Sequence, residues 1–304
     1  YNPNDRSQLA AENLRNKAIT DLFEPGSTMK PLTIAAALES GEYTVNSTID
    51  TSPGFRRFGR FTIRDHRNYG VLDLTEIIVK SSNVGVSNIA TDLGGDTLRN
   101  LYARLGLGQA TGIGFPGEAV GVLPAPPKWR PVEESTLSYG YGMSVNALQL
   151  AQAYMVIANG GIRYPLSLMR QEQRPQGQRV LSEQVTRAVR DMLKQAVARG
   201  TGKRARPGLY AAGGKTGTVH LVGANGYEDS QYKAIFAGMA PIDDPRIVTV
   251  VAVDAPQAGE YYGGEVAAPV FARVMGDALR LLNVKPELEV SETRVSQVTS
   301  GGRG

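Results

Sequence analysis

The sequence has 304 residues, of which 41% are hydrophobic and 20% charged, and its formal net charge is +4. This length suffices for one large domain or two ordinary ones with a buried core, and no apolar run is long enough to cross a bilayer. The absence of cysteine excludes disulfides, thiol catalysis and cysteine metal sites. The small net charge allows at most a weak preference for anionic partners. We interpret the sequence as having no dense Lys/Arg run interleaved with aromatic residues, so a nucleic-acid partner is not expected.

Apolar spacing predicts mainly helices in the first two thirds of the chain. The predicted helices cover 31–40, 72–94 with a break at 81–85, 146–161 and 181–200. Gly41 and Gly160 provide stop signals, and Ser182 is a plausible cap for the last of these helices. Polar residues at 44–64 predict loops and short strands, and the Gly- and Pro-containing segment 106–135 predicts an extended, ordered loop.

The last third of the chain has a different pattern. Three short runs with β-branched or aromatic residues, 213–223, 231–241 and 246–256, predict consecutive strands of an antiparallel sheet. A closing helix is expected at 266–283, followed by a polar tail. Helices in the middle and strands at the end predict an α+β fold. We expect one domain over 1–285 and a tail at 286–304.

Ser27 and Lys30 form an S-x-x-K motif at the start of the first predicted helix. Positions i and i+3 share one face of a helix, so the amine can reach the hydroxyl there. A second copy, Ser230 and Lys233, falls on a predicted strand, where these positions point to opposite faces. The motif alone is also compatible with an N-cap serine and a solvated lysine.

Two S-x-N motifs follow, at Ser81–Asn83 and at Ser144–Asn146. The first interrupts an apolar helical run. Polar side chains buried there would cost free energy unless they interact with a partner. The second is explained as a helix cap. We therefore favour Ser81 and Asn83 as functional residues.

The run GGKTGT places Lys215, Thr216, Gly217 and Thr218 at the start of a predicted strand. A phosphate-binding P-loop is disfavoured, because Gly208 lies one residue too far from Gly214 and a strand follows instead of a helix. On a strand edge, a cation, two hydroxyls and backbone donors suit an extended peptide that carries a carboxylate.

S-x-x-K, S-x-N and K-T-G occur in the order known for penicillin-binding proteins and class A β-lactamases. The segments FEPGSTMKP, IVKSSNVGVSNIA, LSYGYGMSVNALQLAQAY and AGEYYGGEVAAPVFARVM also resemble one group. Over roughly residues 1–285, the chain is similar to the transpeptidase domain of division-type class B penicillin-binding proteins (penicillin-binding protein 3). This implies an antiparallel sheet flanked by helices plus an all-helical subdomain, with an anchor and a non-catalytic domain outside these residues.

The resemblance implies a role for each motif residue. Ser27 would be the nucleophile toward D-Ala-D-Ala, and Lys30 its base, with a pKa depressed by burial or by the nearby cation Lys215. Ser81 would relay a proton and Asn83 would hold the substrate amide. The backbone N–H groups of Ser27 and Thr218 would form the oxyanion hole. Thr216 and Thr218 would bind the substrate carboxylate, beside Gly217.

His220 departs from the family pattern, in which a basic residue often occupies this position. Histidine is charged mainly at acidic pH, so we expect carboxylate binding to strengthen as the pH falls. The departure also raises the alternative of a specialised paralogue.

Tyr232, Tyr261 and Tyr262 are candidates for a wall of the cleft, or ordinary tyrosines. His66 and His220 are expected to be structural or substrate-facing residues.

The resemblance implies no cofactor or metal. Its expected partners are peptidoglycan stem peptides, β-lactam antibiotics, a SEDS-family glycosyltransferase and other division proteins, at the periplasmic face of a bacterial inner membrane. Three alternatives stay open: a D,D-carboxypeptidase, a non-enzymatic β-lactam sensor and a serine β-lactamase. The last is disfavoured because no E-x-x-L-N segment is present.

Overall fold

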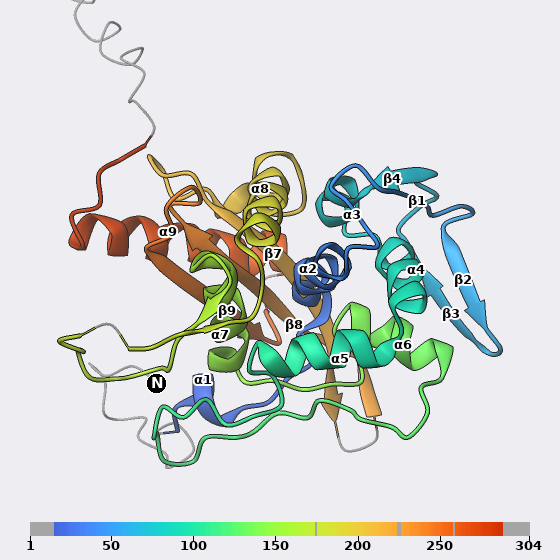
Figure 1. Cartoon of the computed structure of the whole chain (residues 1–304), viewed down its shortest axis with the longest axis horizontal. Helices are drawn as coiled ribbons and strands as arrows, with labels where there is room; N and C mark the ends of the chain where they lie inside the picture. Colours follow the sequence, from blue (N-terminus) through green and yellow to red (C-terminus); the bar gives the residue numbers. More distant parts are fainter. Residues whose placement is uncertain (1–14, 174, 224–225, 258, 288–304) are drawn as a thin grey trace, which may run out of the picture.

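A computed structural model describes residues 15–287, with the exception of 174, 224, 225 and 258. It confirms the predicted α+β class: a three-stranded antiparallel sheet lies between helices on one side of the molecule, and a mainly helical part lies beside it (Figure 1). Short elements complete the described chain: α1 Lys17–Thr20, η3 Gly26–Met29, β5 Ile162–Arg163, β6 Gln178–Arg179 and η4 Lys203–Ala205.

The three strands predicted near the end of the chain form the sheet in the order β7-β8-β9, with β7 Gly213–Gly223, β8 Gly226–Ala240 and β9 Ile247–Asp254. Side chains of β8 alternate between two hydrophobic cores. Phe236 packs on Phe271 of α9 (Gly263–Leu281), with ring centroids 4.7 Å apart, whereas Ile235 and Ala237 face the larger core. Burial on both faces explains the almost continuous apolar run of this strand.

The larger core joins the sheet to the helical part. Its helices include α2 Lys30–Ser40, α7 Ala147–Ala158 and α8 Glu183–Arg199. Gly41 ends α2 with φ 79°, the left-handed conformation that favours glycine. Ser182 caps α8 by accepting from Val185 N at 3.3 Å, as predicted. Asn146 caps α7 by accepting from Gln149 N at 2.7 Å, so the second S-x-N motif is a helix cap.

The predicted helix at 72–94 is divided at the predicted break. The outcome is β4 Val71–Asp73, α3 Leu74–Lys80 and α4 Asn83–Leu93, followed by α5 Gly95–Arg104. Ser81 ends α3 with φ 58°, and Ser82 caps α4 by accepting from Gly85 N at 2.9 Å. The loop expected at 106–135 ends earlier, because α6 begins at Pro131 and runs to Ser138; proline is well suited to a first helical turn.

The helical part is not wholly helical, because two small sheets border it in the region predicted as loops and short strands. β1 Thr48–Asp50 pairs with β4, and β2 Phe55–Phe58 pairs with β3 Phe61–Arg64. The second pair belongs to FRRFGRFTIRDHRNY at 55–69. The expectation that the chain has no dense basic run interleaved with aromatic residues is therefore wrong for this segment, because a small net charge does not exclude a local cluster.

Most of the predicted tail, 288–304, lies outside the described residues. Glu287, within the predicted tail, is bound to the fold: its N–H donates to Leu209 O at 3.2 Å, and its carboxylate accepts from Ala211 N at 2.9 Å. Within the described ranges, none of the helices has the length and apolar character that a membrane span requires.

Candidate active site

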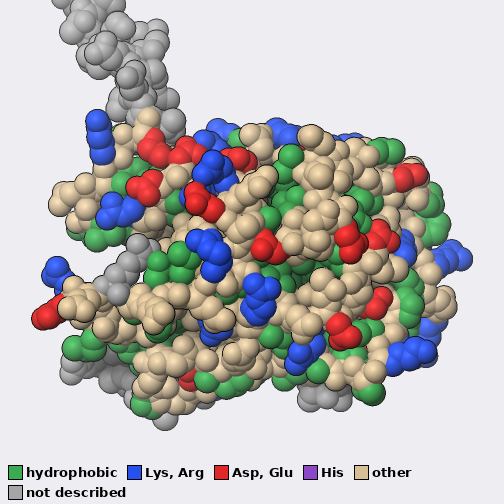
Figure 2. All heavy atoms as spheres, in the orientation of Figure 1, with side chains coloured by type: hydrophobic (Ala, Val, Ile, Leu, Met, Phe, Trp, Pro, Cys, Tyr) green, Lys and Arg blue, Asp and Glu red, His purple; other side chains and the backbone are tan. Residues whose placement is uncertain are grey.

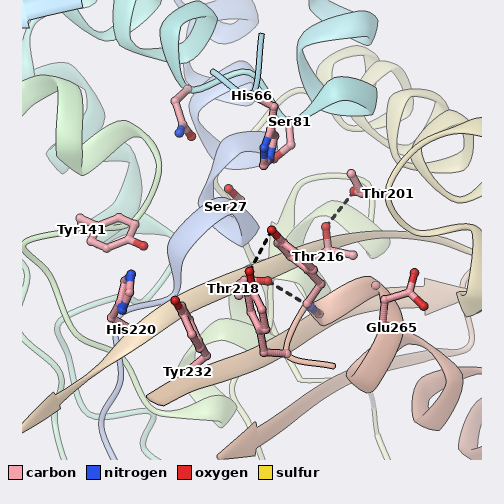
Figure 3. A pocket seen from close by; sticks show the side chains of 15 residues that line it. Ser27, His66, Ser81, Tyr141, Thr201, Thr216, Thr218, His220, Tyr232 and Glu265 are labelled. Atoms are coloured by element: carbon pink, nitrogen blue, oxygen red, sulfur yellow. Dashed lines mark hydrogen bonds between the residues drawn. The ribbon is translucent and has the colours of Figure 1, made fainter. Parts of the chain in front are cut away.

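Most of the residues singled out from the sequence line one cavity of about 530 Å³ between the sheet and the helical part (Figure 3). The lining side chains from the three motifs are Ser27, Ser81, Asn83, Thr216 and Thr218. Lys30 and Lys215 lie behind this surface and are fully buried. Gly217 packs against η3: a Cβ there would lie 3.1 Å from Pro25 O.

A one-turn 3₁₀ helix, η3, holds Ser27 at the cavity. Gly26 enters this turn with φ 57° and donates its N–H to Gly140 O at 3.1 Å. A Cβ on Gly26 would lie 2.5 Å from Cγ1 of Val219 in β7. Only glycine allows this close approach, so the sequence Pro25-Gly26 sets the distance between the serine and the sheet.

Lys30 begins α2, and its amine points toward the S-x-N motif. Nζ lies 2.5 Å from Ser81 O, 3.0 Å from Ser81 Oγ and 2.7 Å from Asn83 Oδ1. The ammonium form donates to all three. The neutral amine can donate to the two carbonyl oxygens and accept from the Ser81 hydroxyl. Among the described residues, no hydrogen bond joins Lys30 to Ser27. The expected contact between this amine and the Ser27 hydroxyl is thus not formed here, and the sequence did not reveal Ser81 and Asn83 as the partners of the amine.

Burial is the main reason why the pKa of Lys30 lies well below that of a free lysine, and the nearby charge of Lys215 lowers this pKa further. The carboxylate of Asp65 acts in the opposite direction and raises it. Burial also lowers the pKa of Lys215 to about 7. Near pH 7 the amine of Lys215 therefore exists in part as a neutral group, which an exposed lysine does not do. Burial shifts the pKa of Lys30 in the same direction.

Asp65 organises the S-x-N motif, although the sequence reasoning did not select it. Its carboxylate accepts from Ser82 Oγ and Asn83 N, both at 2.6 Å, and from Val84 N at 3.0 Å. A carboxylate at the first turn of α4 also interacts favourably with the helix dipole. The side chain of Asn83 donates to Arg64 O at 3.0 Å, so its amide oxygen is directed to Lys30.

The K-T-G strand presents two hydroxyls to the cavity from the edge of the sheet. Lys215 Nζ lies 3.2 Å from Thr216 O and 3.3 Å from Thr216 Oγ1. Thr216 Oγ1 is also 2.7 Å from Oγ1 of Thr201, a residue that the sequence reasoning missed. Thr218 Oγ1 accepts from Gly263 N at 3.0 Å, at the start of α9. Because β7 is an edge strand, its unpaired backbone groups remain available to a ligand.

Aromatic side chains form another wall, as expected for Tyr232, Tyr261 and Tyr262. The rings of Tyr232 and Tyr261 stack with centroids 4.3 Å apart, and His220 lies 4.5 Å from Tyr232. His220 Nδ1 is 3.1 Å from Glu228 O. Tyr141, which the sequence reasoning did not select, also lines the cavity. The expected gain in carboxylate binding at acidic pH through His220 stays a prediction.

The second S-x-x-K motif has a structural explanation. Lys233 is paired with Asp254, and its amine lies 5.1 Å from the ring centroid of Phe23.

His66 lines the cavity next to Ser81 (Figure 3). Within the part of the chain that the structure describes, no three His, Asp or Glu side chains are grouped as a metal site requires.

This arrangement is suited to acyl transfer. A serine on a helical turn lines the cavity together with the hydroxyls of an edge strand, and a buried amine with a lowered pKa lies close to them. Nucleophile, base and backbone donors are the parts that such chemistry needs.

Comparison with known proteins agrees with this interpretation. Residues 1–276 match the penicillin-binding protein transpeptidase domain family. The peptidoglycan D,D-transpeptidase FtsI of Escherichia coli K12 is 41% identical over 305 residues, which cover all of this chain and 52% of the relative. The probable peptidoglycan D,D-transpeptidase PbpC of Pseudomonas aeruginosa is 40% identical over 94% of this chain and 51% of the relative.

Solved structures show the same likeness. The transpeptidase domain of Burkholderia pseudomallei penicillin-binding protein 3, in its apo form, has a TM-score of 0.86 and 42% identity, over 91% of this chain and 85% of that one. The chain spans about half the length of the curated relatives FtsI and PbpC. From motifs, fold and comparisons together, the chain belongs to the transpeptidase domain family of the class B penicillin-binding proteins, in the group of penicillin-binding protein 3 and FtsI.

Proposed function

We propose that this domain is a peptidoglycan D,D-transpeptidase that cross-links stem peptides through an acyl-enzyme on Ser27 during septal wall synthesis, and that β-lactams acylate the same serine. The observation that carries the proposal is the buried amine of Lys30. It contacts Ser81 Oγ at 3.0 Å and Asn83 Oδ1 at 2.7 Å behind a cavity that Ser27 lines.

In the acylation step, Ser27 Oγ attacks the carbonyl carbon of the penultimate D-Ala, and the peptide bond to the terminal D-Ala breaks. The neutral amine of Lys30 takes the serine proton, and Ser81, which is hydrogen-bonded to Lys30, passes a proton to the leaving nitrogen. In the second step, the amine of an acceptor stem attacks the ester carbonyl. It loses a proton along the same route, and Ser27 Oγ is protonated again as it leaves.

The lowered pKa of Lys30 makes this role possible, because only the neutral form can accept a proton. Burial and the charge of Lys215 lower the pKa. The acylation rate should therefore rise with pH, and the midpoint of this rise should lie below the pKa of a free lysine, 10.5.

Thr216 and Thr218 line the cavity from β7 and are assigned to the terminal carboxylate; the protonated amine of Lys215, hydrogen-bonded to Thr216, supports this assignment. The N–H groups of Ser27 and Thr218 are assigned to the oxyanion hole. Asn83 is assigned to the substrate amide. His220, Tyr232 and Tyr262 line the same cavity and are assigned to substrate contacts.

The remaining assignments rest on family membership. Residues 1–285 are taken as the catalytic domain of a longer protein that is anchored in the inner membrane and faces the periplasm. A SEDS-family glycosyltransferase would supply the glycan strands that this domain cross-links, together with other division proteins.

A cross-linking assay tests the proposal. A donor peptide that ends in D-Ala-D-Ala is incubated with the domain and an acceptor peptide that carries a free amine, and the products are identified by mass. A cross-linked product that disappears with Ser27→Ala supports the transpeptidase. Release of D-Ala to give only the shortened donor would indicate a D,D-carboxypeptidase, and acylation by penicillin without peptide turnover would indicate a sensor.

A further inference from the structure

The β2–β3 hairpin carries a concentrated positive charge. Residues 55–67 contain five arginines and one aspartate, a net charge of +4, which equals the formal charge of the whole chain. The hairpin forms one edge of the molecule in Figure 1, and basic side chains are visible along that edge in Figure 2. The remainder of the chain is close to electrical neutrality, so this hairpin dominates the charge asymmetry.

One arginine of the hairpin has a structural role. Arg56 donates to Ser87 O at 2.9 Å and to Thr91 Oγ1 at 3.0 Å, which attaches β2 to α4. On the same face of the hairpin, Ile63 is buried. These contacts fix the hairpin to the fold, so its opposite face is presented to solvent in a defined orientation.

The solvent face holds two arginines close to one aromatic ring. Register pairs Phe55 with Arg64, and Arg57 lies on the same face. The guanidinium carbons of Arg57 and Arg64 are 5.6 Å and 5.4 Å from the ring centroid of Phe55. Aromatic contact restricts the guanidinium groups without using their hydrogen-bond donors. The donors thus remain free for a planar anion.

The exposed arginines of this segment lack a counter-charge among the described residues. Those at 57, 60, 64 and 67 form no ion pair with any Asp or Glu that the structure describes, whereas arginines elsewhere, such as Arg187 with Glu183, do. Each of the four instead lies over an aromatic ring. An unneutralised cluster of this kind favours an anion supplied by a partner.

The hairpin leads directly into the catalytic cavity. β3 ends at Arg64, whose carbonyl accepts from Asn83 Nδ2 at 3.0 Å. Asp65 then holds the S-x-N motif, and His66 lines the cavity. Arg64, Asp65 and His66 thus join the end of the hairpin to residues of the cavity that Ser27 lines.

We propose that the Arg57–Phe55–Arg64 face is a docking subsite for stem-peptide carboxylates of the peptidoglycan strand. This inference rests on the proposed function, because it assigns part of the same substrate to a surface outside the cleft. Guanidinium groups match carboxylates in geometry as well as charge. The hairpin is connected to the cavity in which the substrate reacts. This connection favours the substrate over a lipid surface or a nucleic acid, neither of which takes part in a reaction at Ser27.

The test measures binding of soluble, uncross-linked peptidoglycan strands to Ser27→Ala protein, so that no turnover occurs. The hairpin variant is Arg57→Gln/Arg64→Gln. The matched control is Arg187→Gln/Arg280→Gln, which removes the same charge from exposed arginines of α8 and α9. The same strands with amidated stem carboxylates serve as the second ligand.

We expect the hairpin variant to bind strands with free carboxylates about tenfold more weakly, as the loss of charged hydrogen bonds implies. The control should stay within about twofold, and amidation should abolish the difference. Equal binding by the hairpin variant, or a loss that persists with amidated strands, would overturn the proposal. So would a loss confined to anionic lipid vesicles or an oligonucleotide.

Penicillin acylation separates this proposal from the proposed function. With Ser27 present, both double variants should be acylated at the wild-type rate, because a small β-lactam does not reach the hairpin. If wild-type protein itself is not acylated, the proposed function fails. If acylation is intact and strand binding is unchanged, only the docking subsite fails.

Discussion

Replacing Lys215 with methionine should remove a large pH dependence of stability. The side chain is fully buried, and burial lowers its pKa from 10.5 to about 7. In the unfolded chain the amine keeps its proton until about pH 10. Between these values the unfolded chain binds more protons than the folded protein, so the free energy of unfolding rises with pH.

The magnitude follows from the two pKa values. Integrating the difference in bound protons from pH 7 to pH 9 gives roughly 2 kcal/mol that the wild type gains and Lys215→Met lacks. Loss of the positive charge also raises the pKa of Lys30, which reduces the contribution of Lys30 to the same slope. Both effects act in one direction, so the difference between the two proteins should be at least this large.

Urea unfolding at pH 7, 8 and 9 measures the effect, with both proteins compared at each pH. The same variant should shift the rising limb of penicillin acylation to higher pH, because Lys30 then loses its proton less readily. If the free energy of unfolding changed equally with pH in the wild type and in Lys215→Met, the assignment of a lowered pKa to Lys215 would be refuted. An unshifted acylation limb would refute the electrostatic coupling between the two lysines.

Three further predictions concern the supports of the site. Asp65→Asn should cost about 1–3 kcal/mol in stability, because three hydrogen bonds lose a charged acceptor. It should also shift the rise of the acylation rate to lower pH, since Asp65 raises the pKa of Lys30. An unchanged pH profile of acylation would contradict this. Thr201→Val removes the partner of Thr216 Oγ1, so the affinity for carboxylate-bearing β-lactams should fall by about threefold to tenfold, with little change in the rate at saturation; a reduced saturating rate with unchanged affinity would argue otherwise. Gly26→Ala should destabilise the protein more than Gly41→Ala, because both have positive φ but only Gly26 would place a Cβ against Val219; equal melting temperatures for the two variants would disprove this.

Much of the site is predictable from the order of the three motifs along the chain. Ser27, Ser81, Thr216 and Thr218 line one cavity, and the order of the three strands was also predictable from β-branched runs bounded by Gly, Pro and Asp. The strands are local features, which composition reports directly. The meeting of the three motifs in one cavity was implied by the resemblance to penicillin-binding proteins and not by spacing.

The features that escaped prediction depend on contacts between distant residues. Lys30 meets Ser81 and Asn83 across more than 50 positions, and no periodicity encodes that contact. Asp65 was not predicted because its partners lie at the start of α4, 17 to 19 positions further along the chain. Thr201 meets Thr216 only because α8 packs beside β7.

Short strands were expected within 44–64, and the β2–β3 hairpin agrees with that prediction; its pairing and its cluster of arginines were not predicted. Its strands are four residues long and rich in arginine, so they lack the alternation that marks longer strands. The small net charge of the whole chain, +4, gives no indication of this local cluster. A windowed charge count would have found it from the sequence.

The assignment of Ser27 as the nucleophile is tested most directly by the intact mass of the protein during incubation with a penicillin, for wild type and Ser27→Ala. The account predicts a stable adduct of whole-drug mass on the wild type, and none on Ser27→Ala. A short-lived adduct with continuing drug hydrolysis would mean that the domain is a β-lactamase. An adduct that persists in Ser27→Ala would contradict the assignment of the nucleophile.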